Sequence, residues 1–380
     1  MKIDFRYVFL CIILACVSFL TGVQLQKHQA FIPLKRLLRG QSPLIAPPHP
    51  ELLNWDQAQN QKAQPQFVLS GLPLPEIENN RRSYQEKIQE LLGMSRFPLW
   101  YRPAAEALGR EDAGGVIREK WLLETEPGLK IPFYLSIPKD LKEKRPLVLV
   151  LYGHSSGKEE TAGSLDTYQH RNAWALARAG FVTAAPDFRG FGELGWQGNW
   201  EDPQGHTYGK NIHVQDGISN LQRGRTVLGS YLYDLQQLTS YLKTRQEIDP
   251  QRIGVAGTSM GADIALWFVV LHPAIKAAVA SHSTLISEPS LLDYTIPAHL
   301  CVHTIPGILD FFRLQDIPLL AAPRPMLLTF NLDAQSEVNR KNLEGLYQQS
   351  GNGDKISFVV RHGGENFDNA AAVEWFRKWL

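Results

Sequence analysis

The chain of 380 residues is poor in cysteine and carries almost no net charge. Two of its three cysteines, Cys11 and Cys16, lie in an apolar N-terminal segment, and only Cys301 lies in the body of the chain. If that segment is removed, no disulfide can form within the chain, so the cysteines do not identify the cellular compartment. The formal net charge of +1 gives no electrostatic reason to expect a nucleic acid as a partner.

A long apolar run, residues 7–23, follows Lys2 and Arg6 at the N-terminus. This arrangement predicts an export signal or an uncleaved signal anchor over residues 1–24, and hence a membrane-anchored, periplasmic or extracellular protein. The run is long for a cleaved signal and marginal for a membrane span, and no clean A-x-A cleavage site follows it. Both alternatives therefore stay open, with the anchor favoured. A lipoprotein cleavage box at residues 13–16 is disfavoured because the sequence stays apolar beyond it.

The rest of the chain divides into an extension and a larger domain. Residues 25–110 are rich in Pro and Gln, and within them the apolar positions of residues 76–94 predict one helix that ends at Gly93. From residue 111 to residue 380, strand and helix patterns alternate, beginning with two strands joined at residues 126–128. Further strands are predicted at 146–152, 181–185, 253–256, 275–281, 326–331 and 356–360, and helices at 168–179, 231–245 and 370–380. This order predicts an α/β fold with a mostly parallel, doubly wound sheet.

The strongest chemical motif lies at residues 257–261, which read G-T-S-M-G between a short apolar strand and an apolar helix. A G-x-S-x-G pattern in a strand, sharp turn, helix context is typical of a nucleophile elbow, with Ser259 exposed at the turn. The amide of Met260, at the helix N-terminus, could then face a developing oxyanion. The alternative is a glycine-rich turn that holds an ordinary serine.

Two more loops follow strand ends, where ligands of open α/β sheets collect. Residues 152–158 contain Gly153 and His154, whose backbone amides could approach a substrate oxygen; the alternative is a plain turn. Residues 190–195 match G-x-G-x-x-G, but the sequence after them, with Pro203 and further glycines, does not read as the helix that dinucleotide binding requires. We therefore expect no nucleotide cofactor.

Six segments between residues 113 and 380 are similar to a known group of proteins. They read REKWLLETEPGLKIPFYLSIP, LYGHSSGKEE, PDFRGFGELG, LYDLQQLTSYLKTRQEIDPQRIGVAGTSMGADIAL, CVHTIPGILDFFRLQDIPLLAAPRPMLL and FVVRHGGENF. In this combination the chain resembles the α/β-hydrolase superfamily, and within it bacterial dienelactone-hydrolase-like and acetylxylan-esterase-like hydrolases. The resemblance implies an α/β-hydrolase fold over 111–380.

The resemblance also implies a serine nucleophile, then an acid, then a histidine, in that chain order. Ser259 fits the first role, and Asp333, after the strand at 326–331, is the best acid, with Glu337 as the fallback. Relatives usually carry G-G-H-x-F near the chain end, whereas this chain has Glu365 at the histidine position. The nearest histidine is His362, which is either the catalytic base or a strand-end residue bonded to backbone.

A metal site is also conceivable, since His299, Cys301 and His303 alternate along the chain and could present three ligands on one face. Cys301 and His303, however, match a stretch that recurs in the resembled family without a metal. We therefore expect neither a metal nor any other cofactor.

These observations favour a serine hydrolase that cleaves carboxylic esters, with acetyl esters of carbohydrates as the first substrates to test. The alternative is a catalytically degenerate binding protein with the same fold, which Glu365 favours. A peptidase is disfavoured because no repeats typical of a propeller precede the catalytic part. The expected partners are a small-molecule or carbohydrate ester, no nucleic acid, and the membrane if the N-terminal segment is uncleaved.

The first prediction concerns the location of the chain. Because positive residues ahead of an apolar run stay on the cytoplasmic side, residues 25–380 are expected outside the cytoplasm. Lys27, Lys35, Arg36 and Arg39 lie after the run and weaken this bias. Fractionation of a tagged full-length chain should recover it with membranes or beyond them, and a purely cytoplasmic soluble pool would contradict the prediction.

Overall fold

The computed structural model describes residues 64–99, 101–155, 157–164, 167–195, 212–287, 300–331, 334–361 and 366–380. The chain divides into two compact units, Met1–Ala63 and Gln64–Leu380, and all of the described residues belong to the second. The predicted signal or anchor over residues 1–24 therefore lies outside the described residues. None of the helices formed by the described residues is long and apolar enough to cross a membrane.

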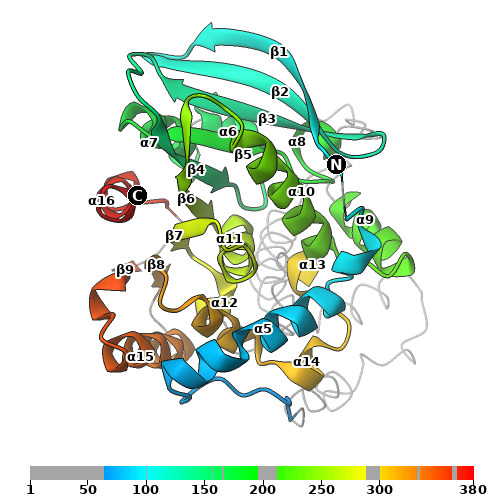
Figure 1. Ribbon diagram of the computed structural model, residues 1–380, viewed down its shortest axis with the longest axis vertical. Coiled ribbons are helices and arrows are strands. Elements are labelled where there is room, and N and C mark those ends of the chain that lie inside the picture. The colour runs from blue at the N-terminus through cyan, green and yellow to red at the C-terminus, as the bar shows by residue number, and fades with distance from the viewer. Residues whose placement is uncertain are drawn as a thin grey trace, which may run out of the picture. The chain divides into compact units, whose positions relative to one another are not determined.

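A nine-stranded sheet organises the Gln64–Leu380 unit, with the strands in the order β1-β2-β3-β5-β4-β6-β7-β8-β9 (Figure 1). The strands are β1 (Ala104–Asp112), β2 (Val116–Glu126), β3 (Leu129–Pro138), β4 (Arg145–Leu151), β5 (Val182–Pro186), β6 (Ile248–Thr258), β7 (Ile275–Ser281), β8 (Met326–Asn331) and β9 (Ile356–Arg361). From β5 to β9 all neighbours pair in parallel, whereas β1, β2, β3 and β5 pair antiparallel. The predicted mostly parallel sheet is confirmed, and β1 is an additional strand that was not predicted.

Helices cover both faces of this sheet. They are α5 (Leu74–Leu91), α6 (Lys158–Ala162), α7 (Asn172–Arg178), α8 (Gly192–Gly195), α9 (Ile212–Gln222), α10 (Val227–Leu242), α11 (Met260–Leu271), α12 (Thr284–Ser287), α13 (Leu300–His303), α14 (Ile308–Phe311), α15 (Ala334–Gln349) and α16 (Asn369–Trp379), with 3-10 turns η1 (Met94–Arg96), η2 (Leu314–Ala321) and η3 (Gly353–Lys355). Helix α7 begins later than predicted because His170 and Arg171 adopt positive φ.

Alternation along the central strands assigns side chains to two separate cores. In β4, Leu147 and Leu149 belong to the larger core, which α10 and α11 also line. The intervening Val148 and Val150 belong to the smaller core, which is closed by α7 and α16. Since neighbouring side chains of a strand point to opposite faces, these two cores are the two faces of a doubly wound sheet.

The predicted helix near the start of the described chain is confirmed as α5, which ends at Leu91 and is followed by Gly93 in the left-handed conformation. Its apolar side is buried in the larger core, with Ile77 and Ile88 fully covered. Arg81 donates from this helix to the carbonyl oxygens of Leu320 and Ala322. Helix α5 is therefore an integral part of the unit that contains the sheet.

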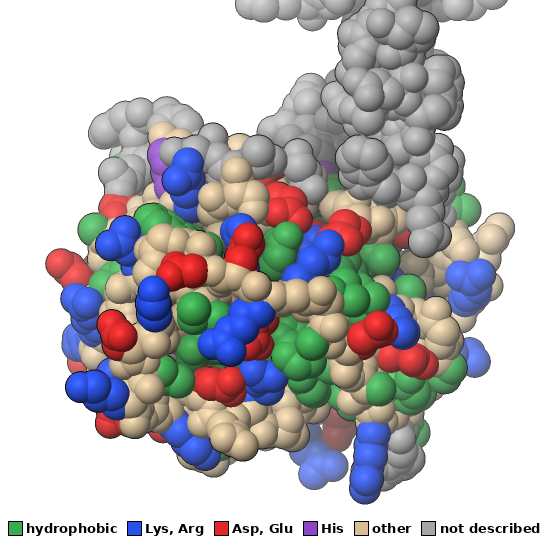
Figure 2. Space-filling view, turned by 90° about the horizontal axis from the view of Figure 1, so that it is seen from above, with side chains coloured by type: hydrophobic (Ala, Val, Ile, Leu, Met, Phe, Trp, Pro, Cys, Tyr) green, Lys and Arg blue, Asp and Glu red, His purple; other side chains and the backbone are tan. Residues whose placement is uncertain are grey.

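Charged side chains of both signs are interspersed on the face shown in Figure 2, which lies on the side of β1, β2 and β3. In this part of the sheet, Lys130 on β3 pairs with Glu106 on β1, and Lys139, just after β3, pairs with Asp112 at the end of β1. Such exposed pairs contribute little to stability, but charge along an outer strand discourages pairing with a second sheet.

The second prediction tests whether α5 contributes to stability. Ile88→Ala removes a side chain that is 0% exposed and should lower the free energy of unfolding by about 2–5 kcal/mol, because a cavity remains. The control is Val338→Ala on α15, which is 50% exposed and should change stability by less than about 0.5 kcal/mol. Chemical denaturation of the Gln64–Leu380 unit measures both values, and equal effects would show that α5 packs only loosely.

Candidate functional site

The turn between β6 and α11 brings Ser259 to the carboxyl end of the sheet. Ser259 has φ 55° and ψ −124°, and the helix begins at the next residue, Met260. Positive φ is uncommon for a serine and costs about 1–3 kcal/mol, and such strain gathers at functional sites. The sharp strand-to-helix turn predicted at this position is present.

Two glycines make this turn possible. A Cβ atom at Gly257 would approach the backbone of Gly261, and one at Gly261 would approach the carbonyl oxygens of Leu151 and Tyr152, in each case closer than 3.0 Å. Real Cβ contacts are essentially never that short. Both glycines are therefore required because backbone packs directly on backbone.

Ser259 is held from two sides and is only 4% exposed. Its amide donates to the carbonyl oxygen of Ser281 at 2.8 Å, and its own carbonyl oxygen accepts from the amides of Ala262 and Asp263 at 2.9 and 3.2 Å. The amide of Met260 lies in the first turn of α11, where helix N–H groups have no partner within the helix and the helix dipole favours negative charge. An anion that forms beside Ser259 would meet this end of the helix.

The loop after β4 reaches the same place. A Cβ atom at Gly153 would lie 3.0 Å from the Cβ of Ser259 and 3.1 Å from the carbonyl oxygen of Thr258, so the backbone of Gly153 packs against the serine. The next residue, His154, stacks its ring edge-to-face on Phe191 at 5.6 Å between centroids. The loop suggested for an oxyanion contact and the candidate nucleophile are therefore adjacent.

Cys301 joins this group from α13. Its Sγ lies 3.3 Å from His154 Nε2 and 4.0 Å from Met260 Sδ. Burial raises the pKa of the Cys301 thiol to about 12, so the neutral thiol dominates at neutral pH. Two of the three residues proposed to supply oxyanion amides, His154 and Met260, thus contact the same thiol through their side chains.

His303 has a different partner from Cys301. Its Nε2 lies 3.1 Å from Oδ2 of Asp263, on the first turn of α11. Asp263 also accepts from the hydroxyl of Ser283 at 2.6 Å and from the amide and hydroxyl of Thr284 at 2.8 and 2.7 Å. Asp263 was not predicted as a site residue, although a carboxylate within an otherwise apolar helix was a visible signal that a buried polar partner exists.

His282 is a second residue that sequence reasoning missed. It is buried, has φ 58°, and follows Ser281 at the end of β7. Its Nδ1 lies 3.0 Å from the hydroxyl of Ser281, which in turn accepts from the hydroxyl of Thr329 at 2.7 Å. Positive φ at a histidine leaves no trace in a side-chain pattern, so nothing in the sequence indicated this conformation.

The remaining predicted residues, Asp333, His362 and Glu365, lie outside the described residues, as does His299. In sequence, Asp333 follows β8 and His362 follows β9, and both strands run parallel to β6 and so end at the same edge of the sheet. The fallback acid Glu337 is bonded to Arg340 at 2.9 Å, and this bond lowers its pKa to about 2. Its carboxylate is therefore already engaged on α15.

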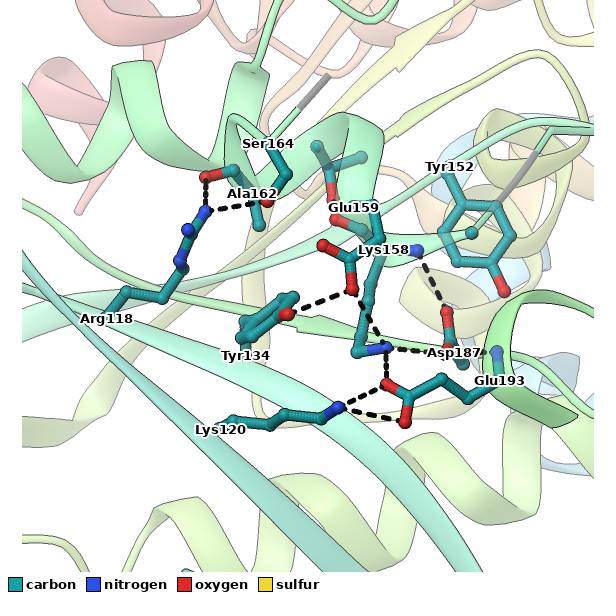
Figure 3. Close-up of polar contacts among 12 residues, drawn as sticks. Arg118, Lys120, Tyr134, Tyr152, Lys158, Glu159, Ala162, Ser164, Asp187 and Glu193 are labelled. Carbon is teal, nitrogen blue, oxygen red and sulfur yellow. Dashed lines mark hydrogen bonds and ion pairs between the residues drawn. The ribbon is translucent and has the colours of Figure 1, made fainter. Parts of the chain in front are cut away.

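A buried ion pair lies beside the loop after β4 (Figure 3). Lys158 Nζ lies 2.8 Å from Oδ2 of Asp187, and both side chains are about 1% exposed. Asp187 also accepts from the amide of Glu193, within the G-x-G-x-x-G segment, at 3.1 Å. The backbone amide of Glu193 in this segment is therefore already bonded to a carboxylate.

The chain is similar in sequence to known proteins. The family model described as the Abhydrolase family matches residues 76–363. A protein of Bacillus subtilis (strain 168), provisionally named hydrolase YtaP, is 26% identical over 294 residues, which are 73% of this chain and 93% of that protein.

Solved structures share the fold at lower identity. A provisionally assigned acetyl xylan esterase of Bacteroides fragilis NCTC 9343 superposes with a TM-score of 0.65 at 22% identity, covering 87% of this chain and 90% of that one. The methylesterase BT1017 has a TM-score of 0.63 at 20% identity, covering 85% and 68%. The glucuronoyl esterase from Solibacter usitatus has a TM-score of 0.56 at 13% identity, covering 83% and 98%.

The third prediction tests the close packing at the turn. Gly261→Ala should destabilise the unit by at least about 1–3 kcal/mol, the usual effect of overpacking, because its Cβ would meet strand backbone that cannot move aside. The control is Gly345→Ala in the middle of α15, where nothing lies within 4 Å of the added Cβ. That change should stabilise the unit by about 0.5–1 kcal/mol, since alanine is the better helix former. Denaturation curves that shift equally for both variants would contradict this account.

Proposed function

We propose that this chain, which belongs to the Abhydrolase family, is a serine hydrolase that cleaves carboxylic esters through an acyl-enzyme. Its fold is the predicted α/β-hydrolase fold, with a mostly parallel sheet covered by helices on both faces. The same fold supports many activities, so the proposal depends on the residues at the carboxyl edge of the sheet.

The observation that carries the proposal is the strained backbone of Ser259. A serine with φ 55° stands at the start of a 12-residue helix, with the backbone of Gly153 packed against its Cβ. A turn that merely joined a strand to a helix could use a relaxed residue. The strain, the two obligatory glycines and the adjacent amide-bearing loop all favour a nucleophile at this position.

In the proposed reaction, Ser259 Oγ attacks the ester carbonyl carbon and its proton passes to a base. The oxyanion of the tetrahedral intermediate accepts hydrogen bonds from the amide of Met260 and from that of Gly153 or His154. The intermediate collapses, the bond to the alcohol oxygen breaks, and the base returns the proton to the alcohol. Water then attacks the acyl-serine in the same way, releasing the acid and restoring the serine.

We assign the base role to His362 and the role of its orienting acid to Asp333. An imidazole suits the task because it can accept and return a proton near neutral pH. A carboxylate at Glu365 is a weaker base unless burial raises its pKa, and beside Asp333 it would form a pair of like charges. His362 is therefore chemically better suited to be the base than Glu365, which stands where relatives carry their histidine.

For substrates, we propose acetyl and other short acyl esters of carbohydrates. The support for an acetyl ester comes from the structural relative described as an acetyl xylan esterase. The relatives described as a methylesterase and a glucuronoyl esterase support the cleavage of esters in general. We further propose that residues 1–24 direct export, which would bring the enzyme to such substrates outside the cytoplasm.

The fourth prediction tests the proposed site with short p-nitrophenyl esters. Wild-type protein should hydrolyse p-nitrophenyl acetate, and Ser259→Ala and His362→Ala should each lower kcat by about 1,000-fold or more. Glu365→Gln is the matched control and should leave kcat nearly unchanged, because it changes a residue three positions further along the sequence without removing the base. A fluorophosphonate probe should label the wild type and fail with Ser259→Ala.

The degenerate binding protein predicts different results, and Glu365 is the observation that favours it. In that case the folded wild type would be inert, the probe would not label Ser259, and Glu365→His would create activity. Circular dichroism confirms that each variant is folded. A folded wild type that neither turns over short esters nor takes the probe would overturn the serine hydrolase.

A further inference from the structure

The loop that carries Gly153 and His154 ends at an unusual residue, a fully buried lysine. Lys158 is the first residue of α6, and its ammonium lies among the carboxylates of Asp187, Glu193 and Glu159 (Figure 3). Burial alone would lower the pKa of Lys158, but Asp187 and Glu193 outweigh it and the pKa lies above its ordinary value. The lysine is therefore a charged group inside the protein.

A buried charge pair needs good geometry to offset its desolvation, and here the carboxylate of Asp187 is fully used. Its Oδ1 accepts from the backbone amide of Lys158 at 2.9 Å, and its Oδ2 accepts from Lys158 Nζ at 2.8 Å and from the amide of Glu193 at 3.1 Å. One side chain thus binds the backbone of two loops, the one after β4 and the one after β5.

Glycines on both loops leave room for this carboxylate. Gly157 has φ 111°, and a Cβ atom there would lie 2.6 Å from Oδ1 of Asp187. Gly192 has φ 51°, and a Cβ atom there would also collide with Asp187. Both loops are therefore shaped around the carboxylate, and Gly157 also packs closely on the backbone of Gly192.

The two ends of the loop after β4 are consequently fixed by different contacts. At the start, Gly153 packs against Ser259, and at the end the amide of Lys158 is bonded to Asp187. Oxyanion donors act only when they stand about 2.7–3.1 Å from the oxyanion, and a misplacement of about 1 Å can cost a factor of about 100 in rate. The position of the proposed oxyanion amides thus depends on both contacts.

We propose that Lys158 and Asp187 are positioning residues, which hold the loop after β4 so that the amide of Gly153 or His154 faces the oxyanion on Ser259. The inference rests on the proposed serine hydrolase. Both side chains are about 1% exposed, so they are not available to contact a substrate. Their effect is exerted through the backbone, in the transition state, where the oxyanion develops.

The fifth prediction uses the double variant Lys158→Met/Asp187→Asn. This change leaves no unpaired buried charge, and asparagine can still accept a backbone hydrogen bond, so the fold is expected to persist. The kcat for p-nitrophenyl acetate should fall by about 100-fold with KM within about threefold, as for an interaction made only in the transition state. The control is Lys120→Met, which removes a partly exposed lysine that contacts Glu193 at 2.9 Å and should leave both constants unchanged.

Hydrogen exchange of residues 153–157 provides a second readout that needs no turnover. Exchange should be faster in the double variant than in wild type and in Lys120→Met. If the double variant does not fold, Glu193→Gln is used instead, because it weakens the ion pair between Lys158 and the partly exposed carboxylate of Glu193. This variant should also lower kcat and speed up exchange at residues 153–157.

The outcomes separate the two proposals. If the wild type shows no ester hydrolysis, or hydrolysis that does not depend on Ser259, the proposed serine hydrolase is contradicted. The exchange rates then still test whether Lys158 and Asp187 fix the loop after β4. A folded double variant with wild-type kcat, or with unchanged exchange at residues 153–157, overturns the role of Lys158 and Asp187. A loss of thermal stability with kcat unchanged in the folded protein also overturns it, because it indicates a structural role alone.

Discussion

Direct packing of one backbone on another is the constraint on which the rest of this structure depends. Helix α11 starts so close to β4 that Gly261 faces the carbonyl oxygens of Leu151 and Tyr152 without an intervening side chain. This approach sets the strained turn at Ser259 and brings the end of β4, with Gly153, next to the end of β6. The two neighbouring central strands β4 and β6, and helix α11 that packs on them, are thereby held together, and the remaining strands and helices surround them.

Around these elements, several buried carboxylates connect loops. Asp187 binds the loops after β4 and β5, and Asp263 binds the start of α12 and the histidine that ends α13. A third carboxylate, that of Asp234 on α10, accepts two hydrogen bonds from the Arg189 guanidinium, each 2.7 Å long. Each of these groups is costly to bury alone and becomes acceptable only when several donors converge on it. The loops at the carboxyl edge of the sheet are thus ordered by internal charges as well as by apolar packing.

Much of this arrangement could be predicted from sequence because the relevant signals are local. The apolar runs of β4, β5 and β7 identify central parallel strands, and the glycines at 257 and 261 identify a turn that only glycine permits. Strand β1 could not be predicted in this way. Its sequence, AAEALGRED, consists largely of helix-forming residues, and it becomes a strand only because it pairs with β2 along nearly its whole length. The pairing of Lys158 with Asp187 joins residues 29 positions apart, and the positive φ of His282 is a property of the backbone, so neither follows from a local pattern.

Helix α5 has a consequence for how the chain acquires its structure. Arg81 in this helix bonds to Ala322, a residue 241 positions later. The ribosome must therefore synthesise most of the chain before α5 can dock, which at the usual rates of translation takes roughly 10 to 50 seconds. During that interval the native surface that covers the apolar side of α5, with Ile77 and Ile88, is incomplete. The earliest helix of the folded unit is thus among the last to be buried, and the nascent chain exposes it to chaperones for most of its synthesis.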